Sequence, residues 1–245
     1  MLIQKRIVLP WLQNLFIAAV LVCLSATAAE DKAAAKVRVA LAGDSTVTTN
    51  AGWGAAFEKL LGSRGECLQF ARGGQSSKSF RDSGNWKKVI ASKPDYVLIQ
   101  FGHNDMPGKG PNRETDPKTT YRENLARFVD EARAIGATPI LVTSMARRTF
   151  DKGKIRGELA PWADAARAVA AEKRVPLMDL FTRSIELLEK INPEANAVFD
   201  PKTKDGTADH THLSPKGGEV MAGLIADELR KVEPKLAKLL VQPTQ

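Results

Sequence analysis

The chain is poor in the residues that usually mark crosslinked or metal-binding proteins. In 245 residues it has three histidines and two cysteines, and aromatic residues make up 6%. Cys23 lies in an apolar leader, so the other cysteine, Cys67, would have no partner for an internal disulfide. We expect Cys67 to be a small buried core residue and not a nucleophile. The fold must then be stabilised by its core and not by disulfides.

Missing motifs exclude further classes of function. The basic residues behind the net charge of +8 are scattered and have few aromatic neighbours, which argues against nucleic-acid binding. The pair Gly73-Gly74 lacks the spacing of a phosphate-binding loop, and no Gly-x-Ser-x-Gly segment marks an ordinary α/β-hydrolase. The net positive charge suits an acidic polymer as substrate, although a role in solubility alone explains this charge equally well.

Residues 1–28 have the pattern of a signal peptide. A positive start is followed by an apolar run over residues 15–24 and by small residues at Ala26-Thr27-Ala28. The run is shorter than the roughly 20 residues that span a bilayer. A lipoprotein site at Cys23 is a weaker alternative, because the preceding valine is bulky. We therefore expect a periplasmic or secreted protein without stable membrane association, in which residues 29–245 form a single domain.

Five short apolar runs predict five strands. Several are almost continuously apolar, as in the strands of a parallel sheet that is covered on both faces. The predicted strands are Val37–Ala42, Cys67–Ala71, Tyr96–Phe101, Thr138–Thr143 and Val175–Asp179.

Helical periodicity separates these strands. Apolar residues recur on one face over Tyr121–Ile135, Trp162–Glu172 and Ile185–Ile191. A last helix is expected to begin after Ser214, as N-cap, with Pro215 in its first turn. The alternation predicts an α/β protein: a three-layer α/β/α sandwich with a five-stranded, mostly parallel sheet.

Polar motifs follow three of the predicted strands. They are Gly43-Asp44-Ser45, Gly73-Gly74 and Gly102-His103-Asn104-Asp105. Ligands of an open parallel sheet bind beyond the carboxyl ends of its strands, so the motifs should meet at one edge. There the backbone N–H groups of Ser45 and Gly74 and the amide of Asn104 would form an oxyanion hole.

A second group of polar residues precedes the last helix. Asp209 and His212 are three residues apart, so the carboxylate can fix the tautomer of the imidazole while its other nitrogen takes a proton from Ser45. Zinc binding by His210, His212 and Asp209, with or without His103, is a competing interpretation. We rank it second, because it leaves the serine, glycine and asparagine motifs without a role.

Taken in order, these motifs resemble the four blocks of the SGNH/GDSL hydrolase superfamily. Segments Gly73–Phe80, Gln100–Asp105 and Asp209–Ser214 are similar to the rhamnogalacturonan acetylesterase group of carbohydrate esterases, and the likeness runs from about Val37 to Leu229. It implies a flavodoxin-like fold, deacetylation of a plant polysaccharide, typically pectin, and no metal or organic cofactor. Gln75 departs from the arginine expected in many relatives, which bears on substrate choice.

The resemblance also implies roles for individual residues. Ser45 would be the nucleophile, Asp209 and His212 would complete a catalytic triad, and Gly74 and Asn104 would join the Ser45 N–H in the oxyanion hole. Candidates for substrate binding are Asp44, His103, His210, Arg147 and Arg148. One of the two arginines is expected to pair with a uronate carboxylate, although a solvated pair explains the sequence at least as well.

Other functions stay open at this point. A lipase, thioesterase or acetylxylan esterase of the same superfamily would use the same catalytic residues. Polar loops at 106–118 and 196–208 favour a wet carbohydrate cleft over an acyl-chain pocket. A non-enzymatic carbohydrate-binding protein would not need every catalytic residue type. The expected partner is an acetylated polysaccharide or oligosaccharide, with no nucleic acid, and we expect a monomer.

Overall fold

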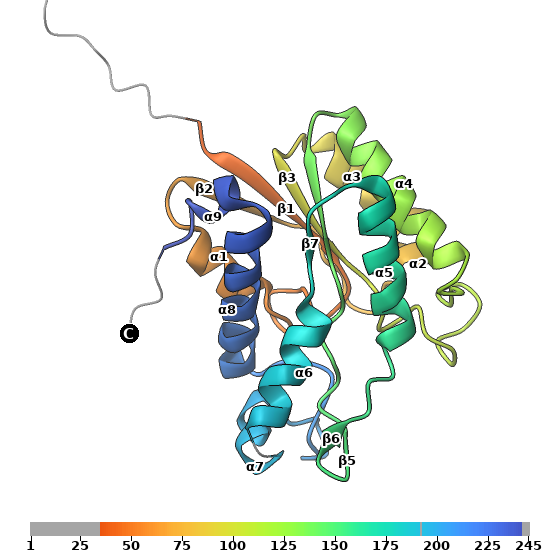
Figure 1. Ribbon diagram of the computed structural model, residues 1–245, viewed down its shortest axis with the longest axis vertical. Helices are drawn as coiled ribbons and strands as arrows, with labels where there is room; N and C mark the ends of the chain where they lie inside the picture. Colours follow the sequence, from red (N-terminus) through yellow and green to blue (C-terminus); the bar gives the residue numbers. More distant parts are fainter. Residues whose placement is uncertain (1–34, 192, 242–245) are drawn as a thin grey trace, which may run out of the picture. The chain divides into compact units, whose positions relative to one another are not determined.

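A five-stranded parallel sheet forms the centre of the computed structural model, which describes residues 35–191 and 193–241 (Figure 1). The strand order is β2-β1-β3-β4-β7, and every neighbouring pair is parallel. The strands are β1 (Val37–Gly43), β2 (Gly65–Gln69), β3 (Tyr96–Gln100), β4 (Thr138–Val142) and β7 (Leu177–Met178). The predicted fold class is confirmed, and the leader predicted at residues 1–28 lies outside the described residues.

The sheet is covered on both faces because its strands alternate between two cores. In β1, Val39 and Leu41 face one core, whereas Ala40 and Ala42 face the other. Both cores consist of buried apolar side chains. Burial of one large apolar side chain, such as leucine or phenylalanine, stabilises the folded state by about 1.5–3 kcal/mol. The near-continuous apolar runs in the sequence are the signature of this double burial.

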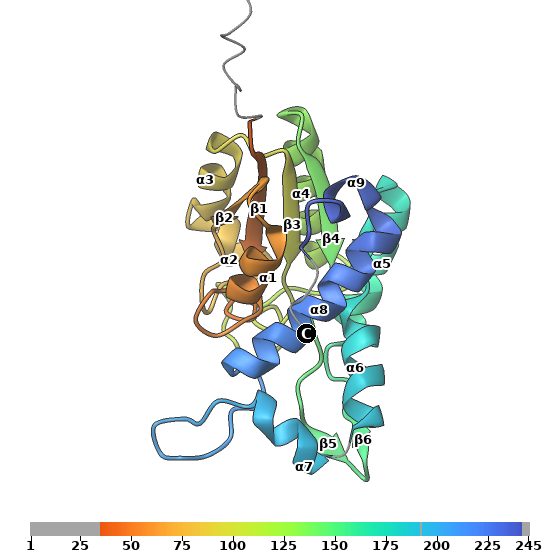
Figure 2. The same cartoon turned by 90° about the vertical axis from the view of Figure 1, so that its left-hand side faces the viewer.

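Two groups of helices form the outer layers (Figures 1 and 2). One face packs against α1 (Gly54–Leu61), α6 (Leu180–Lys190), α8 (Pro215–Val232) and α9 (Pro234–Ala237). The other packs against α2 (Ser77–Asp82), α3 (Asn85–Ala91), α4 (Thr120–Ala134) and α5 (Ala160–Lys173). The observed α8 begins as predicted, since the Ser214 hydroxyl accepts a hydrogen bond from the Gly217 N–H at 3.1 Å.

The predicted boundaries differ from the observed ones at short elements. β2 begins two residues earlier than expected, and β7 has only two paired residues where five were expected. The periodicity missed the short helices α1, α2, α3 and α9 entirely. It also missed four elements between β4 and α8: β5 (Phe150–Asp151), β6 (Lys154–Ile155), α7 (Pro193–Asn196) and the 3-10 helix η1 (Ala197–Phe199). Segments of two to eight residues hold too few apolar repeats for a period to stand out.

An aromatic cluster anchors the segment that follows β3. The rings of Phe101 and Phe128 stack with centroids 5.4 Å apart, and Phe80 and Trp86 pack against them at 5.1 and 4.6 Å. The Phe101 carbonyl also accepts a hydrogen bond from the Tyr121 hydroxyl at 2.7 Å. The polar motif that starts at the next residue is therefore held by the core.

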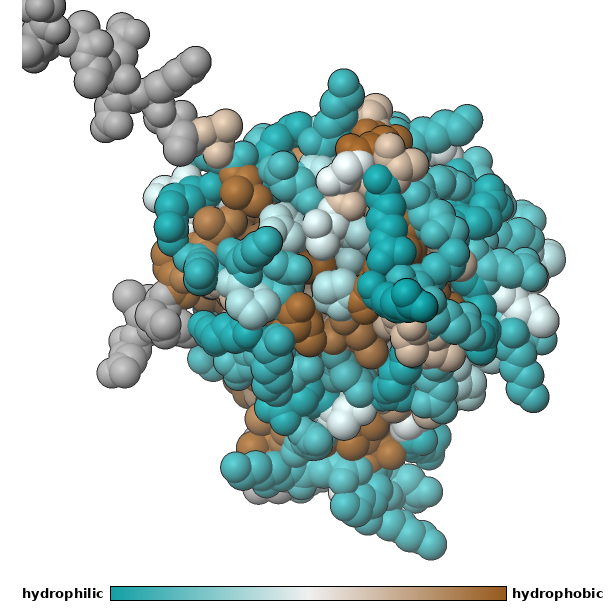
Figure 3. Space-filling view, turned by 45° about the horizontal axis from the view of Figure 1, so that its top comes forward, coloured by the Kyte–Doolittle hydropathy of each residue, from teal (hydrophilic) through white to brown (hydrophobic). Residues whose placement is uncertain are grey.

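The surface of the described residues is largely polar. The face in Figure 3 is mostly hydrophilic, and its apolar residues form separate patches. Among residues 35–191 and 193–241, no helix is both long and apolar enough to cross a bilayer. Cys67 is half-buried, where full burial was expected, and burial raises the pKa of its thiol to about 12. It is therefore no nucleophile at neutral pH.

Candidate active site

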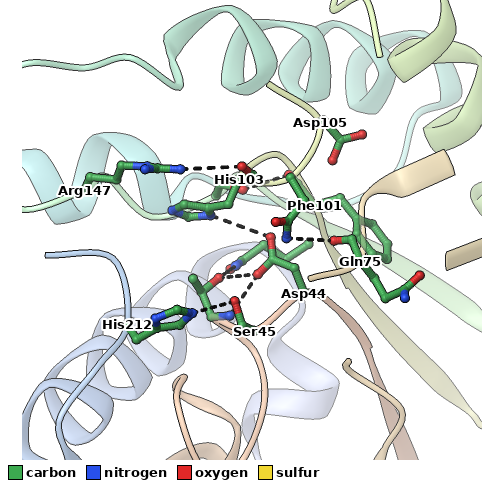
Figure 4. Close-up of polar contacts among 12 residues, drawn as sticks. Asp44, Ser45, Gln75, Phe101, His103, Asp105, Arg147 and His212 are labelled. Carbon is green, nitrogen blue, oxygen red and sulfur yellow. Dashed lines mark hydrogen bonds and ion pairs between the residues drawn. The ribbon is translucent and has the colours of Figure 1, made fainter. Parts of the chain in front are cut away.

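Ser45, His212 and Asp209 form a continuous hydrogen-bonded chain. The Ser45 Oγ lies 2.9 Å from His212 Nε2 (Figure 4). On the other side of the ring, His212 Nδ1 lies 2.7 Å from Asp209 Oδ2. Ser45 follows β1, whereas His212 stands just before α8, so two distant parts of the chain meet here. Nucleophile, base and orienting carboxylate are in the order that activates a hydroxyl.

The Asp209 carboxylate is kept ionised by its own turn. Burial alone would raise its pKa, but hydrogen bonds from the His212 N–H and ring and from the Thr211 N–H outweigh burial and lower the pKa to about 2. The two N–H groups donate to Oδ1 at 3.0 and 2.9 Å, which leaves Oδ2 for the His212 ring. Asp209 therefore orients the imidazole and can stabilise its protonated form.

A buried network fixes the turn that carries Ser45. Asp44 Oδ1 accepts hydrogen bonds from the Thr46 N–H at 2.9 Å and from the Thr46 hydroxyl at 2.7 Å. Gln100 donates to the Thr46 hydroxyl at 2.7 Å and accepts from the Trp53 indole at 3.0 Å. The sequence did not predict these roles of Thr46, Gln100 and Trp53, because a side chain in or near an apolar run reveals nothing of its hydrogen-bond partner.

The residues predicted for the oxyanion hole lie on the segment beside Ser45 or are hydrogen-bonded to it. A side chain added at Gly73 would lie 3.8 Å from the Ser45 Cβ, so the Gly73-Gly74 segment is adjacent to the nucleophile. Gly74 has a φ of +75°, which a residue with a side chain adopts only with strain. Within the described chain, no hydrogen bond engages the N–H of Ser45 or Gly74. The Asn104 amide donates to the Gln75 carbonyl at 3.1 Å, which leaves its second N–H free to donate.

Asp44 and His103 are buried, which corrects their prediction as substrate-binding residues. Their exposed fractions are 0% and 2%, too small for contact with a polysaccharide. His103 Nδ1 instead faces Asp44 Oδ2 at 3.6 Å, directly behind Ser45 (Figure 4). Burial alone would raise the pKa of Asp44, but its contacts with His103 and Thr46 lower it. The pair therefore supports the nucleophile turn from inside the protein.

Arg148 is likewise not free to meet a substrate at Ser45. Its side chain is 1% exposed and forms an ion pair with Asp200. It also donates to the carbonyl oxygens of Asp209, at 3.0 Å, and His212. Arg148 thus clamps the turn that presents the catalytic imidazole, a role that the sequence did not reveal.

Two other arginines lie against the segments that border the nucleophile. Arg147 reaches the His103 carbonyl at 3.5 Å and is partly exposed (Figure 4). A side chain added at Gly74 would lie 3.9 Å from the Arg113 guanidinium, which also donates to the Lys109 carbonyl. Arg147 remains a candidate for substrate contact, and Arg113 joins it.

Asp105 holds two loops together at the edge of the site. Its carboxyl accepts hydrogen bonds from the Ser77 hydroxyl at 2.5 Å and from the Thr115 hydroxyl at 2.9 Å. Burial raises the pKa of Asp105 to about 7, assisted by the charge of Asp44 and opposed by the hydrogen bonds from Ser77 and Thr115. The group is buried away from Ser45, so its role is structural.

His210 does not join His212 in a metal site. Its Nδ1 lies 2.6 Å from Asp200 Oδ2, and its side chain is 48% exposed. In the part of the chain that the structure describes, no three His, Cys, Asp or Glu side chains are placed to hold a metal ion. The zinc interpretation therefore lacks its geometry, while His210 stays available to a bound sugar.

Comparison with known proteins assigns a family. Residues 40–220 match the GDSL-like lipase/acylhydrolase family. The rhamnogalacturonan acetylesterase RhgT of Bacillus subtilis is 37% identical over 84% of this chain and 94% of its own length. The probable rhamnogalacturonan acetylesterase YesY of the same species is 32% identical over 82% and 96%. An acetylxylan esterase from Geobacillus stearothermophilus has a similar fold, with a TM-score of 0.63 and 18% identity over 86% of this chain and 98% of that one.

Proposed function

This chain belongs to the GDSL-like lipase/acylhydrolase family, and from that premise we propose that it is a serine acetylesterase that removes O-acetyl groups from pectic rhamnogalacturonan. The observation that carries the chemistry is the chain from Ser45 through His212 to Asp209, with contacts of 2.9 and 2.7 Å. The substrate rests on the two relatives that cover most of the chain. We further propose that the protein is exported, on the basis of the leader pattern in residues 1–28.

The proposed reaction has two acyl-transfer steps. His212 Nε2 takes the Ser45 proton while Oγ attacks the acetyl carbonyl, and the oxyanion binds to the N–H groups of Ser45 and Gly74 and the amide of Asn104. The intermediate collapses as His212 passes the proton to the sugar oxygen, which leaves as an alcohol. His212 then takes a proton from a water molecule that attacks the acetyl-enzyme. Acetate leaves, and Ser45 regains its proton.

Acetate release from a panel of substrates tests the proposed function. The panel contains acetylated rhamnogalacturonan, acetylated xylan and aryl esters of acetate and octanoate, and Ser45→Ala is the inactive control. We expect the acidic polymer to be the best polysaccharide substrate and acetyl to exceed octanoyl esters. Faster release from xylan would make the protein an acetylxylan esterase, and a preference for octanoate would make it a lipase or thioesterase.

Basic side chains near Ser45 support an acidic substrate. Arg147 contacts the His103 carbonyl and Arg113 lies beside Gly74, and a guanidinium can bind a uronate carboxylate through two parallel hydrogen bonds. We expect Arg147→Ala to lower kcat/KM on acetylated rhamnogalacturonan more than on an aryl acetate, by about tenfold in the ratio, as for the loss of about 1.4 kcal/mol. An equal effect on both substrates would remove Arg147 from substrate recognition.

A further inference from the structure

A second cleft lies beyond the carboxyl edge of the sheet, beside the turn that carries His212. Its volume is about 460 Å³, within the range of sites for small ligands. It lies between the β5–β6 hairpin and α7, which are neighbours in both views of the fold (Figures 1 and 2). Residues that line it include Arg148, Phe150, Arg156, Asn196 and His210.

Two buried side chains of this cleft have a polar atom without a partner. Arg148 and Asn196 are 3% and 2% exposed, yet the Arg148 Nη1 and the Asn196 Oδ1 have no hydrogen-bond partner among the described residues. Their other polar atoms are engaged, as in the bond of 2.9 Å from Asn196 to the Leu188 carbonyl. Buried polar groups are normally paired, so an unpaired donor and acceptor in one cleft call for a partner.

The rim of the cleft adds a cation and an apolar wall. Arg156 is exposed, and its guanidinium has no ion pair within the part of the chain that the structure describes. Among the described residues that line the cleft, Asp200 is the one carboxylate, and it is already shared between Arg148 and His210. Phe150 supplies a partly exposed ring. A ligand with a carboxylate, hydroxyl groups and an apolar face matches this lining.

We propose that this cleft binds a uronic acid residue of the polysaccharide, separate from the acetylated sugar at Ser45. The inference rests on the proposed function, because it needs an acidic chain that is long enough to reach both places. Arg148 connects them, since it lines the cleft and donates to the carbonyl oxygens of Asp209 and His212. A uronate bound there fixes the register of the polymer, and with it the acetyl group that meets the nucleophile.

Two variants test the cleft without touching the triad. Arg156→Ala removes the free cation, and Ala197→Trp places a large side chain at an exposed position that lines the cleft. The matched controls are Arg230→Ala and Ala171→Trp, exposed helix positions that do not line the cleft. The readout is the ratio of kcat/KM for an acetylated acidic oligosaccharide to that for an aryl acetate. We expect each cleft variant to lower this ratio about tenfold, through KM, and both controls to retain it.

A binding measurement keeps this inference separable from the proposed function. Unacetylated oligogalacturonate is titrated into Ser45→Ala and into the double variant Ser45→Ala/Ala197→Trp, and we expect the second to bind at least tenfold more weakly. Equal binding by the two, or an unchanged kinetic ratio, would overturn the cleft assignment. Failure of the unaltered protein to release acetate from any acidic polymer would instead count against the proposed function.

Discussion

At the scale of single residues, the same polar groups serve both folding and the proposed chemistry. Asn104 donates one N–H to the Gln75 carbonyl, and its other N–H is the proposed donor to the oxyanion. The Asp209 carboxylate accepts hydrogen bonds from the backbone of its own turn and also orients the His212 ring. A substitution at such a position removes two functions at once. Kinetic and stability measurements must therefore be made on the same variant.

The first residue-scale prediction concerns Asn104. Asn104→Ala is expected to lower kcat about 100- to 1000-fold and to change KM little, because the amide is proposed to meet charge that develops only in the transition state. Steady-state kinetics on an aryl acetate measures this effect. Asn85→Ala, at a partly exposed asparagine of α3, is the control. Full turnover by Asn104→Ala would exclude Asn104 from the oxyanion hole.

A second prediction uses the Asp105 carboxyl. Its pKa in the folded protein, about 7, lies above its unfolded value near 4, so the folded state prefers the protonated form. The stability that it contributes is complete below about pH 4 and is lost as the pH rises through 7. Asp105→Asn is expected to flatten the fall in Tm over this interval. Calorimetry from pH 4 to 8 checks it, and parallel curves for both proteins would contradict the assignment.

Residue types and their spacing were sufficient to find the triad candidates. A serine after a buried strand, followed late in the chain by Asp209 and His212, is a combination that a purely structural role seldom requires. The structure brings the three side chains into contact. The same logic did not reveal the structural role of Arg148, because its partner Asp200 is 52 residues away and no local pattern connects them. A sequence gives the identity of a polar side chain but not the direction in which it is buried.

At the scale of elements, the site is assembled from turns that regular structure holds in place. The Ser45 turn follows β1, the glycine segment follows β2, and the His212 turn precedes α8. The long helices and buried strands were predictable, because their apolar periodicity reflects burial. The β5–β6 hairpin and α7 were not, because elements of two to four residues are too short to show a period. These unpredicted elements form the second cleft.

The element-scale prediction concerns the clamp on the His212 turn. Arg148→Ala leaves the buried Asp200 carboxylate with His210 as its remaining partner, and the loss of the arginine is expected to cost about 3–5 kcal/mol in the free energy of unfolding. Arg148→Lys is expected to restore little, since a single ammonium cannot bond Asp200 and two carbonyl groups together. Urea unfolding measures the loss. Arg230→Ala, which breaks an exposed pair with Asp227, is expected to stay within about 0.5 kcal/mol of the unaltered protein.

At the scale of the whole molecule, the described residues build the site on a rigid frame. Two apolar cores cover the two faces of the sheet, and the polar motifs lie beyond its carboxyl edge. The full sequence has a net charge of +8, to which Lys5 and Arg6 of the predicted leader contribute, and the positive charge of the remaining chain is expected to attract acidic polymers. We therefore expect the site residues to contact the proposed substrate at short range and the net positive charge to attract it from a distance.

The contribution of long-range electrostatic attraction can be tested by varying the salt concentration. Raising the ionic strength from about 0.01 M to about 1 M shortens the Debye length from about 30 Å to about 3 Å. We expect kcat/KM on acetylated rhamnogalacturonan to fall by at least tenfold over this range, while kcat/KM on a neutral aryl acetate stays within twofold. Identical salt curves for the two substrates would show that long-range charge plays no part.

The two partners of the central proton transfer, Ser45 and His212, are separated by 167 residues of chain. During synthesis, Ser45 therefore stays unreactive until the segment that contains His212 and the last helices has left the ribosome and folded against the sheet. Secondary structure that has formed earlier does not change this. Ester cleavage would thus report the completion of folding. In a refolding experiment, esterase activity should return when the slow long-range contacts form and not when the early helical signal in circular dichroism appears.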